Sequence, residues 1–442
     1  MTTKTTIDHL ITASWVVPVI PEKTIYSDYA IAVHNGRIAG LTPIAEAEEL
    51  YTYHHRTNLP NQAIIPGLIN AHGHASMSLL RGFADDHPLQ TWLQDYIWPV
   101  EGKWVSEEFV HDGTELAMGE MLLSGTTCFH DMYFFPEKVG RLAERVGTRS
   151  FITPNIFDLP CAWGSGPDDY LQKTQQTIDE FKGSELVKIG IGPHAPYTVS
   201  DPVLEKVIAK AADNDLIIQM HVHETQGEVV DAIRDHGQRP LKRLANLGML
   251  NDRFQLVHMT ALNADDFQLL EGSGSHVVHC PESNLKLASG FCPVQKLMDA
   301  GVNVALGTDG AASNNDLNLL SEAQTAALLA KAVAGDATAV SAHKALAMAT
   351  INGAKAMGLE QETGSLEPGK SADLVAIDLS GLPFQPLYEP VSQIIYTGGS
   401  HQVSHVWIRG KCQVKNRQLQ TLDTEKLMNT ARRWKGKISL SA

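Results

Sequence analysis

The stretch AIIPGLINAHGHA, residues 63–75, is the part of the sequence that decides the fold class. Its apolar run over 63–72 is typical of a strand that is buried on both faces of a parallel sheet. The run ends in His72-Gly73-His74, and ionisable side chains are costly to bury unless they have a function. In an α/β barrel, functional groups lie at the carboxyl ends of the strands. The stretch therefore predicts a buried parallel strand that leads into a functional site.

Seven further apolar runs follow along the chain, and helix-like stretches such as 137–147, 204–213 and 318–333 lie between them. Eight alternating units predict an α/β protein with a (β/α)8 barrel of the TIM type. An open, doubly wound sheet is the alternative, although no GxGxxG motif follows the first strand. The seven further strands are expected over 126–132, 149–157, 187–193, 216–223, 254–259, 276–280 and 303–309.

Both ends of the chain show short β-rich runs separated by turns, which predicts antiparallel strands. These runs lie at 7–17, 29–41, 371–379 and 405–414, with turns at Asn35-Gly36 and Gly410. We therefore predict a composite β-sandwich domain formed by residues 1–65 and 365–442. The barrel domain is expected to span residues 66–364.

Composition narrows the classes of partner. The 442 residues carry a formal net charge of −15, with 50 acidic and 35 basic residues. This balance argues against nucleic acid and against an anionic membrane surface as partners. Five scattered cysteines without a CxxC pair fit a reducing cytoplasm. We find no signal-peptide pattern and no apolar stretch of the roughly 18 residues that a membrane helix needs. Barrels of this size often self-associate, so a homo-oligomer is compatible with the sequence.

The strand ends supply a candidate metal site. His72 and His74 are two residues apart, so on an extended segment both side chains point to the same side. With His221 and Asp309 they offer three imidazoles and one carboxylate, a set that suits zinc and leaves a position for water. Chance is the competing explanation for the HxH pair, because the chain holds 19 histidines.

The motif HVHE, residues 221–224, contains two further candidates. We prefer His221 over His223 as the ligand, because Glu224 then falls where the strand turns into its loop. Glu224 is a candidate zinc ligand, salt-bridge partner or general acid. A zinc-protease HExxH motif does not fit, since residue 227 is glycine.

Five motifs together resemble the amidohydrolase superfamily: PGLINAHGHA (66–75), GPHAPYTVS (192–200), HVHET (221–225), LGTDGAASNN (306–315) and GSLEPGKSADLVAIDL (364–379). Within its mononuclear deaminase and chlorohydrolase branch, the chain most resembles the 5'-methylthioadenosine/S-adenosylhomocysteine deaminases. The resemblance covers nearly the whole chain.

The resemblance implies a metal-dependent hydrolytic deaminase that converts the adenine ring of a small nucleoside to hypoxanthine and releases ammonia. One Zn2+ per chain is expected, although Fe2+ or Mn2+ suits the same donors. His194 stands where two-metal members carry a carbamylated lysine, and Lys188 lies earlier on that strand. The implied roles are metal binding by His72, His74, His221 and Asp309, catalysis by Glu224, His258 and Asp309, and substrate binding by Trp92, Glu101, His194, Glu224 and Ser313.

One departure from the family bears on the substrate. Related deaminases can carry a substrate-contacting arginine just beyond the third strand, where this chain has Pro154. Arg149 lies nearby, but its place within the strand suggests a structural role. The absence weakens the case for S-adenosylhomocysteine, whose carboxylate needs a cation, and favours a smaller 5'-thioalkyl substrate such as 5'-methylthioadenosine. Adenosine stays a further possible substrate.

Two of the implied contact residues also fit a role outside the site, since Trp92 could be a core residue and Glu101 a solvated surface charge. The same site could act on guanine, cytosine or a chlorotriazine, although a ribose-binding Glu101 would then have no use. A non-enzymatic scaffold is disfavoured, because all four candidate ligands are present.

Overall fold

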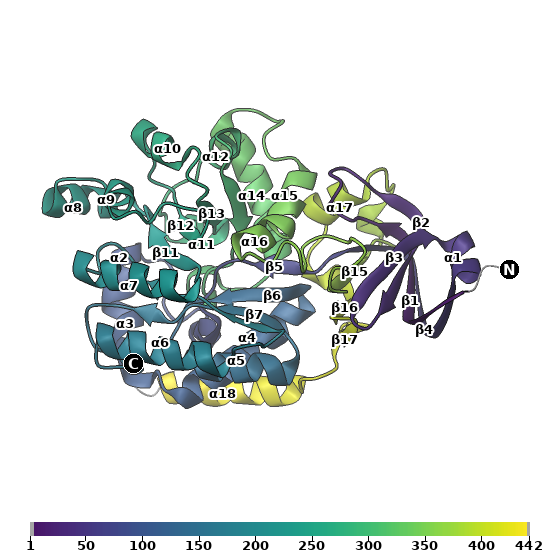
Figure 1. Cartoon of the computed structure of the whole chain (residues 1–442), viewed down its shortest axis with the longest axis horizontal. Coiled ribbons are helices and arrows are strands. Elements are labelled where there is room, and N and C mark those ends of the chain that lie inside the picture. The colour runs from purple at the N-terminus through teal and green to yellow at the C-terminus, as the bar shows by residue number, and fades with distance from the viewer. Residues whose placement is uncertain (1–3, 440–442) are drawn as a thin grey trace.

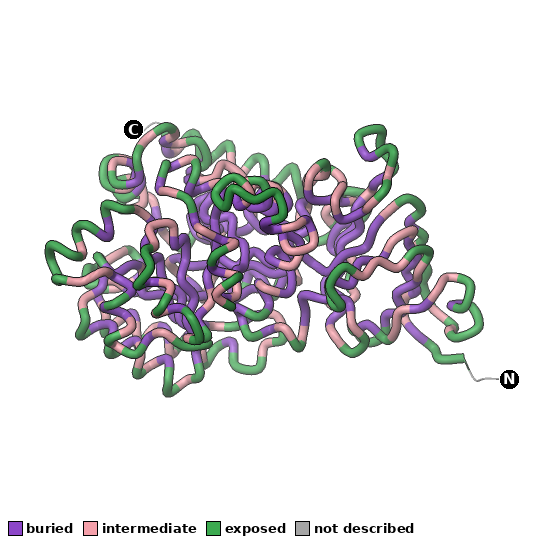
Figure 2. The backbone as a smooth tube through the Cα atoms, turned by 90° about the horizontal axis from the view of Figure 1, so that it is seen from above, coloured by how far each residue is buried: buried purple, intermediate pink, exposed green. Residues whose placement is uncertain are grey.

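The structure is a computed structural model that describes residues 4–439. It has an α/β part and a β-rich part, which lie side by side along the longest axis of the molecule (Figure 1). Buried residues fill the centre of the α/β part and continue into the β-rich part (Figure 2). Among residues 4–439, no helix combines the length and the apolarity that a membrane crossing requires.

The α/β part contains a strand in each of the eight apolar runs, as predicted. Two four-stranded parallel sheets have the orders β5-β6-β7-β9 and β11-β12-β13-β14. Backbone hydrogen bonds join the two sheets at both edges, from Ala71 N to Leu306 O (2.8 Å) and from Ile191 N to Ile217 O (3.0 Å). The strands are β5 Leu68–Asn70, β6 Thr126–Asp131, β7 Arg149–Ile152, β9 Val187–Ile189, β11 Ile218–Val222, β12 Phe254–His258, β13 His276–His279 and β14 Asn303–Leu306.

Two of the runs continue past their first strand into a second, short one. Pro154, which has no backbone N–H, separates β7 from β8 (Asn155–Ile156). Gly190 lies between β9 and β10 (Gly192–Pro193), and a Cβ there would come within 2.7 Å of Ile217 O. β8 and β10 pair with each other in parallel, so they extend the carboxyl ends of the third and fourth runs.

The predicted helical stretches are also present, as α5 Pro136–Val146, α7 Asp201–Asn214 and α14 Leu319–Ala334. Helices follow the strands and lie outside them (Figure 1). The others in this part are η1 Ala75–Leu80, α2 Leu89–Thr91, the π-helical η2 Trp92–Ile97, α3 Trp98–Trp104, α4 Glu107–Leu123, α6 Pro167–Glu180, α8 Gln226–His236, α9 Pro240–Asn246, α10 Ala264–Leu270, α11 Pro281–Lys286, α12 Val294–Asp299, α13 Ala311–Asn314, α15 Ala342–Met348 and α16 Ile351–Ala356.

The β-rich part is one eight-stranded sheet built from both ends of the chain, with the order β18-β17-β16-β15-β4-β1-β2-β3. The predicted hairpin turns at Asn35-Gly36 and Gly410 are present. The parallel pairing of β1 with β4 differs from the antiparallel pattern expected for these ends. The strands are β1 Thr5–Val16, β2 Tyr26–His34, β3 Arg37–Pro43, β4 Tyr51–Pro66, β15 Leu374–Asp378, β16 Val403–Ile408, β17 Lys411–Lys415 and β18 Gln418–Leu419, and α1 Ile44–Leu50 lies between β3 and β4.

The first predicted strand, 63–72, requires a correction because it serves two sheets. Residues 63–66 end β4 in the β-rich part, whereas Leu68–Asn70 form β5 in the α/β part. Gly67 joins them at a close approach, since a Cβ there would lie 2.0 Å from Thr127 Oγ1. One apolar run thus connects the two parts.

The sheet of the β-rich part packs on both faces. Leu374 and Ala376 on β15 belong to a core within the β-rich part, whereas the alternate residues Val375 and Ile377 pack into the core of the α/β part. This alternation follows from the two-residue period of a strand. The backbone of Ile38 donates to Lys370 O (2.9 Å), so β3 at one edge also contacts the segment that leads into β15.

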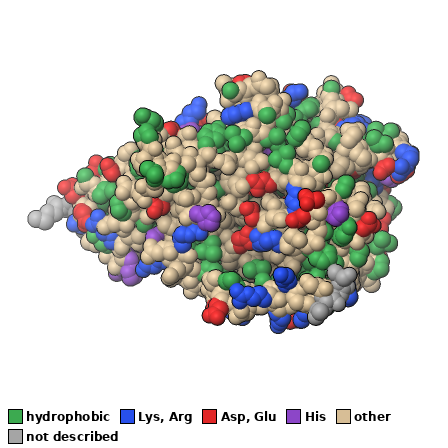
Figure 3. Space-filling model, turned by 180° about the vertical axis from the view of Figure 1, so that it is seen from behind, with side chains coloured by type: hydrophobic (Ala, Val, Ile, Leu, Met, Phe, Trp, Pro, Cys, Tyr) green, Lys and Arg blue, Asp and Glu red, His purple; other side chains and the backbone are tan. Residues whose placement is uncertain are grey.

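The C-terminal segment returns to the α/β part. α17 Pro390–Tyr396 and α18 Thr424–Ser439 both pack there, and η3 Leu382–Phe384 and η4 Ser400–Gln402 are single turns. Trp434 of α18 donates its indole N–H to Asp112 of α4 (2.8 Å) and packs edge-on against Phe109. Figure 1 shows α18 along the α/β part, below α4 and α5. On the face seen in Figure 3, basic and acidic side chains are interspersed.

Candidate metal and active site

A cavity of about 700 Å3 opens at the carboxyl ends of the parallel strands. This is the location where the sequence placed the functional groups. Of the predicted site residues, those that line the cavity are His74, Trp92, Glu101, His194, His221, Glu224, His258 and Asp309. His72 lies beneath them, fully buried.

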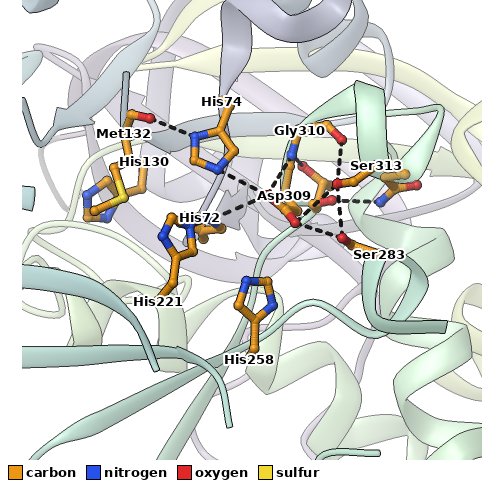
Figure 4. Close-up of polar contacts among 12 residues, drawn as sticks. His72, His74, His130, Met132, His221, His258, Ser283, Asp309, Gly310 and Ser313 are labelled. Carbon is orange, nitrogen blue, oxygen red and sulfur yellow. Dashed lines mark hydrogen bonds and ion pairs between the residues drawn. The ribbon is translucent and has the colours of Figure 1, made fainter. Parts of the chain in front are cut away.

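The four predicted ligands converge at the base of the cavity (Figure 4). His72 Nε2 lies 3.4 Å and His74 Nε2 3.2 Å from Asp309 Oδ1. His221 Nε2 lies 3.2 Å from His72 Nε2. His258 joins the same cluster, because its ring offers a nitrogen within 4.8 Å of those of His72 and His221.

Hydrogen bonds at Nδ1 of His72 and His221 determine which ring nitrogen carries the proton. Gln219 Nε2 donates to Ala71 O (2.9 Å), so its Oε1 must accept from Nδ1–H of His72 (2.7 Å). His221 Nδ1 donates to the carbonyl of His194 (2.8 Å). Carbonyl oxygens only accept, so the Nε2 atoms of neutral His72 and His221 carry lone pairs that face each other.

Two facing lone pairs 3.2 Å apart are unfavourable unless a cation lies beside them. Burial, followed by the neighbouring His72, keeps the pKa of His221 well below its usual value, so its ring is neutral. Imidazoles whose Nδ1–H is held by a partner are the usual form of histidine in metal sites. With the nearby carboxylate of Asp309, these donors fit a divalent cation.

The surroundings of His74 and Asp309 also stabilise a positive charge at this place. Met132 O accepts from His74 Nδ1 (2.6 Å), which turns Nε2 toward Asp309. Burial opposes a charged ring, but the hydrogen bond and charge of Asp309 outweigh it and raise the pKa of His74 to about 9. Positive charge next to this carboxylate is therefore stabilised.

The backbone and two serines position Asp309. Its φ is +61°, a left-handed conformation that is strained for a residue other than glycine and is typical of functional sites. Gly310 N donates to Oδ1 (2.8 Å), and the hydroxyls of Ser283 and Ser313 donate to Oδ2 (2.7 and 3.1 Å). The two serines thus hold Oδ2, whereas Oδ1 faces His72 and His74.

The substrate contact of Ser313 stays a prediction. Its buried hydroxyl bonds to Asp309 and Ser283. It belongs to the short helix α13, which turns the side chain back toward Asp309. Ser313 is therefore a positioning residue for Asp309 in this structure.

Glu224 and His258 face each other across the cavity floor, with Glu224 Oε2 3.7 Å from His258 Nε2. Burial, followed by the charge of Asp309, raises the pKa of Glu224 to about 8. A carboxyl with this pKa keeps its proton at neutral pH and can donate it. His258 Nδ1 bonds to Asn284 Oδ1 (2.9 Å), which directs Nε2 into the cavity.

His223 lies outside this cluster, in agreement with the preference for His221. Its φ of +53° breaks the strand alternation, so its ring turns away. His223 Nε2 accepts from Leu241 N (3.1 Å) instead.

The upper wall of the cavity holds the other predicted contacts. Trp92 lies in the π-helical turn η2, and its buried indole N–H has no hydrogen-bond partner among residues 4–439. Glu101 accepts a hydrogen bond from Tyr133 Oη (2.5 Å). His194 Nδ1 bonds to Thr198 Oγ1 (3.0 Å), and its ring packs 5.3 Å from that of Phe157. Glu101 therefore lies in the cavity wall, hydrogen-bonded to Tyr133, and is not a solvated surface charge.

Four residues that hold these groups were not among the predicted site residues: Gln219, Asn284, Ser283 and Tyr133. Each acts on a partner at least 26 positions away in the chain. The only signal was their place near a strand end or in a loop that follows one. Arg149 is structural as expected, since it is buried and bonds to Asp373, Ser371 and Glu185 O.

The chain is similar to known proteins over nearly its whole length. Residues 63–412 match the model described as "Amidohydrolase family". A 5-methylthioadenosine/S-adenosylhomocysteine deaminase of Teredinibacter turnerae is 51% identical over 438 residues, which cover 99% of each chain. One from Aquifex aeolicus is 41% identical over 95% of this chain and 96% of its own.

The chain also shares its fold with solved structures. An adenosine deaminase from Xanthomonas campestris with bound zinc has a TM-score of 0.98 and 47% identity, covering 99% of this chain and 100% of its own. An atrazine chlorohydrolase from Arthrobacter aurescens has a TM-score of 0.90 and 23% identity, covering 96% of this chain and 99% of its own. The second similarity shows the fold alone.

Proposed function

Because the chain belongs to the amidohydrolase family, we propose that it is a hydrolytic deaminase acting at C6 of the adenine ring of 5'-methylthioadenosine. The products are the corresponding hypoxanthine nucleoside and ammonia. One observation carries the proposal: the buried carboxyl of Glu224, whose pKa is raised by burial, lies in one cavity with the cation-binding cluster and with Glu101. Glu224 and the cation-binding cluster suit the attack of water on a ring carbon, and Glu101 suits the binding of a sugar.

We assign the metal to His72, His74, His221 and Asp309, with one Zn2+ per chain and Fe2+ or Mn2+ as substitutes. Lys188 supports a single ion, because its ammonium bonds to Ser184 O at the surface, away from the cluster. The chemistry that a bound divalent cation supplies is a water molecule acidic enough to attack at neutral pH.

The residues around this cluster then move the protons. Glu224 donates to ring N1, which makes C6 electrophilic. Asp309 accepts the proton that the attacking water gives up, and His258 Nε2 accepts a hydrogen bond from that water. Asp309 then passes its proton to the exocyclic amine, which leaves C6 as ammonia. The C6 hydroxyl gives its proton to Glu224 as the ring carbonyl forms, and the ring keeps the proton on N1. Each general acid–base step of this kind contributes roughly 10²–10⁴-fold.

The proposed substrate-binding residues are Trp92, Glu101, His194, Glu224 and Ser313. Glu101 suits the sugar hydroxyls, because Tyr133 already orients its carboxylate. The apolar wall formed by Leu159, Pro160 and Ala162 suits a thioalkyl group.

Arg243 is the one arginine or lysine that lines the cavity among the described residues. Its guanidinium nitrogens are already held by Asp201, Pro196 O and Val199 O. This arrangement favours 5'-methylthioadenosine over S-adenosylhomocysteine, whose carboxylate needs a free cation. A free base or a chlorotriazine is the second candidate, and the Glu101–Tyr133 pair speaks against it.

For the architecture, we propose that the eight parallel strands close into a (β/α)8 barrel and that the β-rich sheet folds over as a sandwich. The hydrogen bonds at both sheet edges and the contact of β3 with the segment before β15 support this. We place the domain limits at 66–364 for the barrel and at 1–65 with 365–442 for the sandwich, with α18 packed onto the barrel.

For the cellular setting, we propose a cytoplasmic enzyme whose partner is the nucleoside, with no nucleic acid or membrane involved. The described cysteines are all free, which fits a reducing compartment. Self-association is compatible with this proposal.

The test is ammonia release by the zinc-loaded protein, measured in parallel with 5'-methylthioadenosine, S-adenosylhomocysteine and adenosine. We expect the highest kcat/KM with the methylthio nucleoside and at least about tenfold less with S-adenosylhomocysteine, because its charged end would be buried unpaired. Release from guanine or a chlorotriazine but from none of the nucleosides would contradict the proposal.

A further inference from the structure

Asn155 lines the cavity without a role in the mechanism described above. It begins β8, directly after Pro154, and its side chain is 4% exposed. Its backbone N–H bonds to Tyr133 O (3.4 Å), and it pairs with Gly192 on β10. Asn155 therefore lies at the barrel mouth, between the strand end that carries Tyr133 and the one that leads to His194.

The side-chain amide oxygen of Asn155 lacks a partner. Its buried Oδ1 accepts no hydrogen bond within residues 4–439. Buried amides in native proteins are nearly always bonded, and an unmade bond costs stability. Asn70 shows the usual case: it is also buried, and it bonds to Thr308 at both ends of its amide (2.7 and 3.0 Å). The unpaired amide oxygen of Asn155 suggests that a ligand completes it.

The neighbours of Asn155 indicate which part of a ligand this is. Asn155 and Phe157 are two residues apart and both line the cavity, as the strand period requires. Phe157 packs against His194, while Tyr133 on the other flank holds Glu101. Trp92 adds a buried, unpartnered N–H to the same cavity. Glu101 offers a hydrogen-bond acceptor, Trp92 offers a donor, and the amide of Asn155 offers both. Together these groups are complementary to a pair of hydroxyl groups.

We propose that Asn155 is a further specificity-determining residue, whose side-chain amide hydrogen-bonds a sugar hydroxyl of the nucleoside. The amide oxygen accepts from the hydroxyl, and the amide nitrogen can donate to the neighbouring sugar oxygen. This inference rests on the proposed function. It adds to Glu101 a neutral contact that distinguishes a ribonucleoside from a free base or a deoxynucleoside.

The experiment compares wild type with Asn155→Ala on 5'-methylthioadenosine and on its 2'-deoxy and 3'-deoxy analogues. We expect kcat/KM of the variant to fall about tenfold on the parent nucleoside, mainly through KM, as for one lost hydrogen bond. On the analogue that lacks the contacted hydroxyl, wild type and variant should differ less than about twofold. Tm of ligand-free Asn155→Ala should be unchanged or higher, whereas Asn70→Ala should lower Tm, because it breaks satisfied bonds.

The outcomes separate the two proposals. Equal losses on all three nucleosides, or a lower Tm for Asn155→Ala, would show a merely structural role and overturn the assignment of Asn155 alone. If wild-type protein with bound zinc deaminates none of the nucleosides, the proposed function fails, and the sugar contact fails with it.

Discussion

Glu224→Gln lowers kcat on 5'-methylthioadenosine by about 10³-fold or more, while the protein keeps its metal. The buried carboxyl of Glu224, with a pKa of about 8, holds the proton that N1 must receive. An amide of the same shape cannot transfer it, and a single acid–base group contributes roughly 10²–10⁴-fold. Steady-state ammonia release, with metal content measured by elemental analysis, checks both parts.

A matched control is Glu115→Gln. Glu115 is also buried, but it pairs with Arg145 on α5, away from the cavity, so this variant should keep wild-type turnover. Loss of metal from Glu224→Gln would instead place Glu224 among the ligands. Wild-type turnover in that variant would remove Glu224 from the mechanism.

Asp309→Asn has the second large effect, because it removes both a ligand and a proton acceptor. The two serine hydroxyls and Gly310 N all donate to this side chain, so an amide would present N–H groups to donors. We expect bound metal to fall well below one equivalent and turnover to fall at least about 10³-fold.

Ser283→Ala provides the graded comparison for Asp309. It removes one hydrogen bond to Oδ2 and leaves the carboxylate in place. Loss of such a supporting contact typically costs about 10–100-fold in metal affinity or activity. Full metal content together with wild-type activity in Asp309→Asn would contradict the ligand assignment.

The strand ends could be predicted from the sequence because two local rules act there. Buried parallel strands are apolar along their length, and the functional residues of barrels lie at the carboxyl ends of the strands. His72, His74, His221 and Asp309 all follow such runs, and the structure brings them together. The preference for His221 over His223 also agrees, although the physical reason, a left-handed backbone at His223, is not visible in the sequence.

The contacts behind the site could not be predicted in the same way. The orientation of the Gln219 amide depends on Ala71 O, about 150 positions away in the chain, and no local pattern encodes it. The hydrogen bond from Ser313 to Asp309 likewise depends on the turn of α13 and has no local sequence signal. The division of 63–72 between two sheets depends on the close approach of Gly67 to Thr127, which is a tertiary contact.

The most direct test of hydrolytic deamination at C6 is the mass of the product formed from 5'-methylthioadenosine in ¹⁸O-labelled water. The account predicts a hypoxanthine nucleoside with one ¹⁸O in its ring carbonyl, with the methylthio group and the bond between base and sugar intact, and one ammonia per product. Free adenine, loss of the methylthio group, or a product without the label would contradict it.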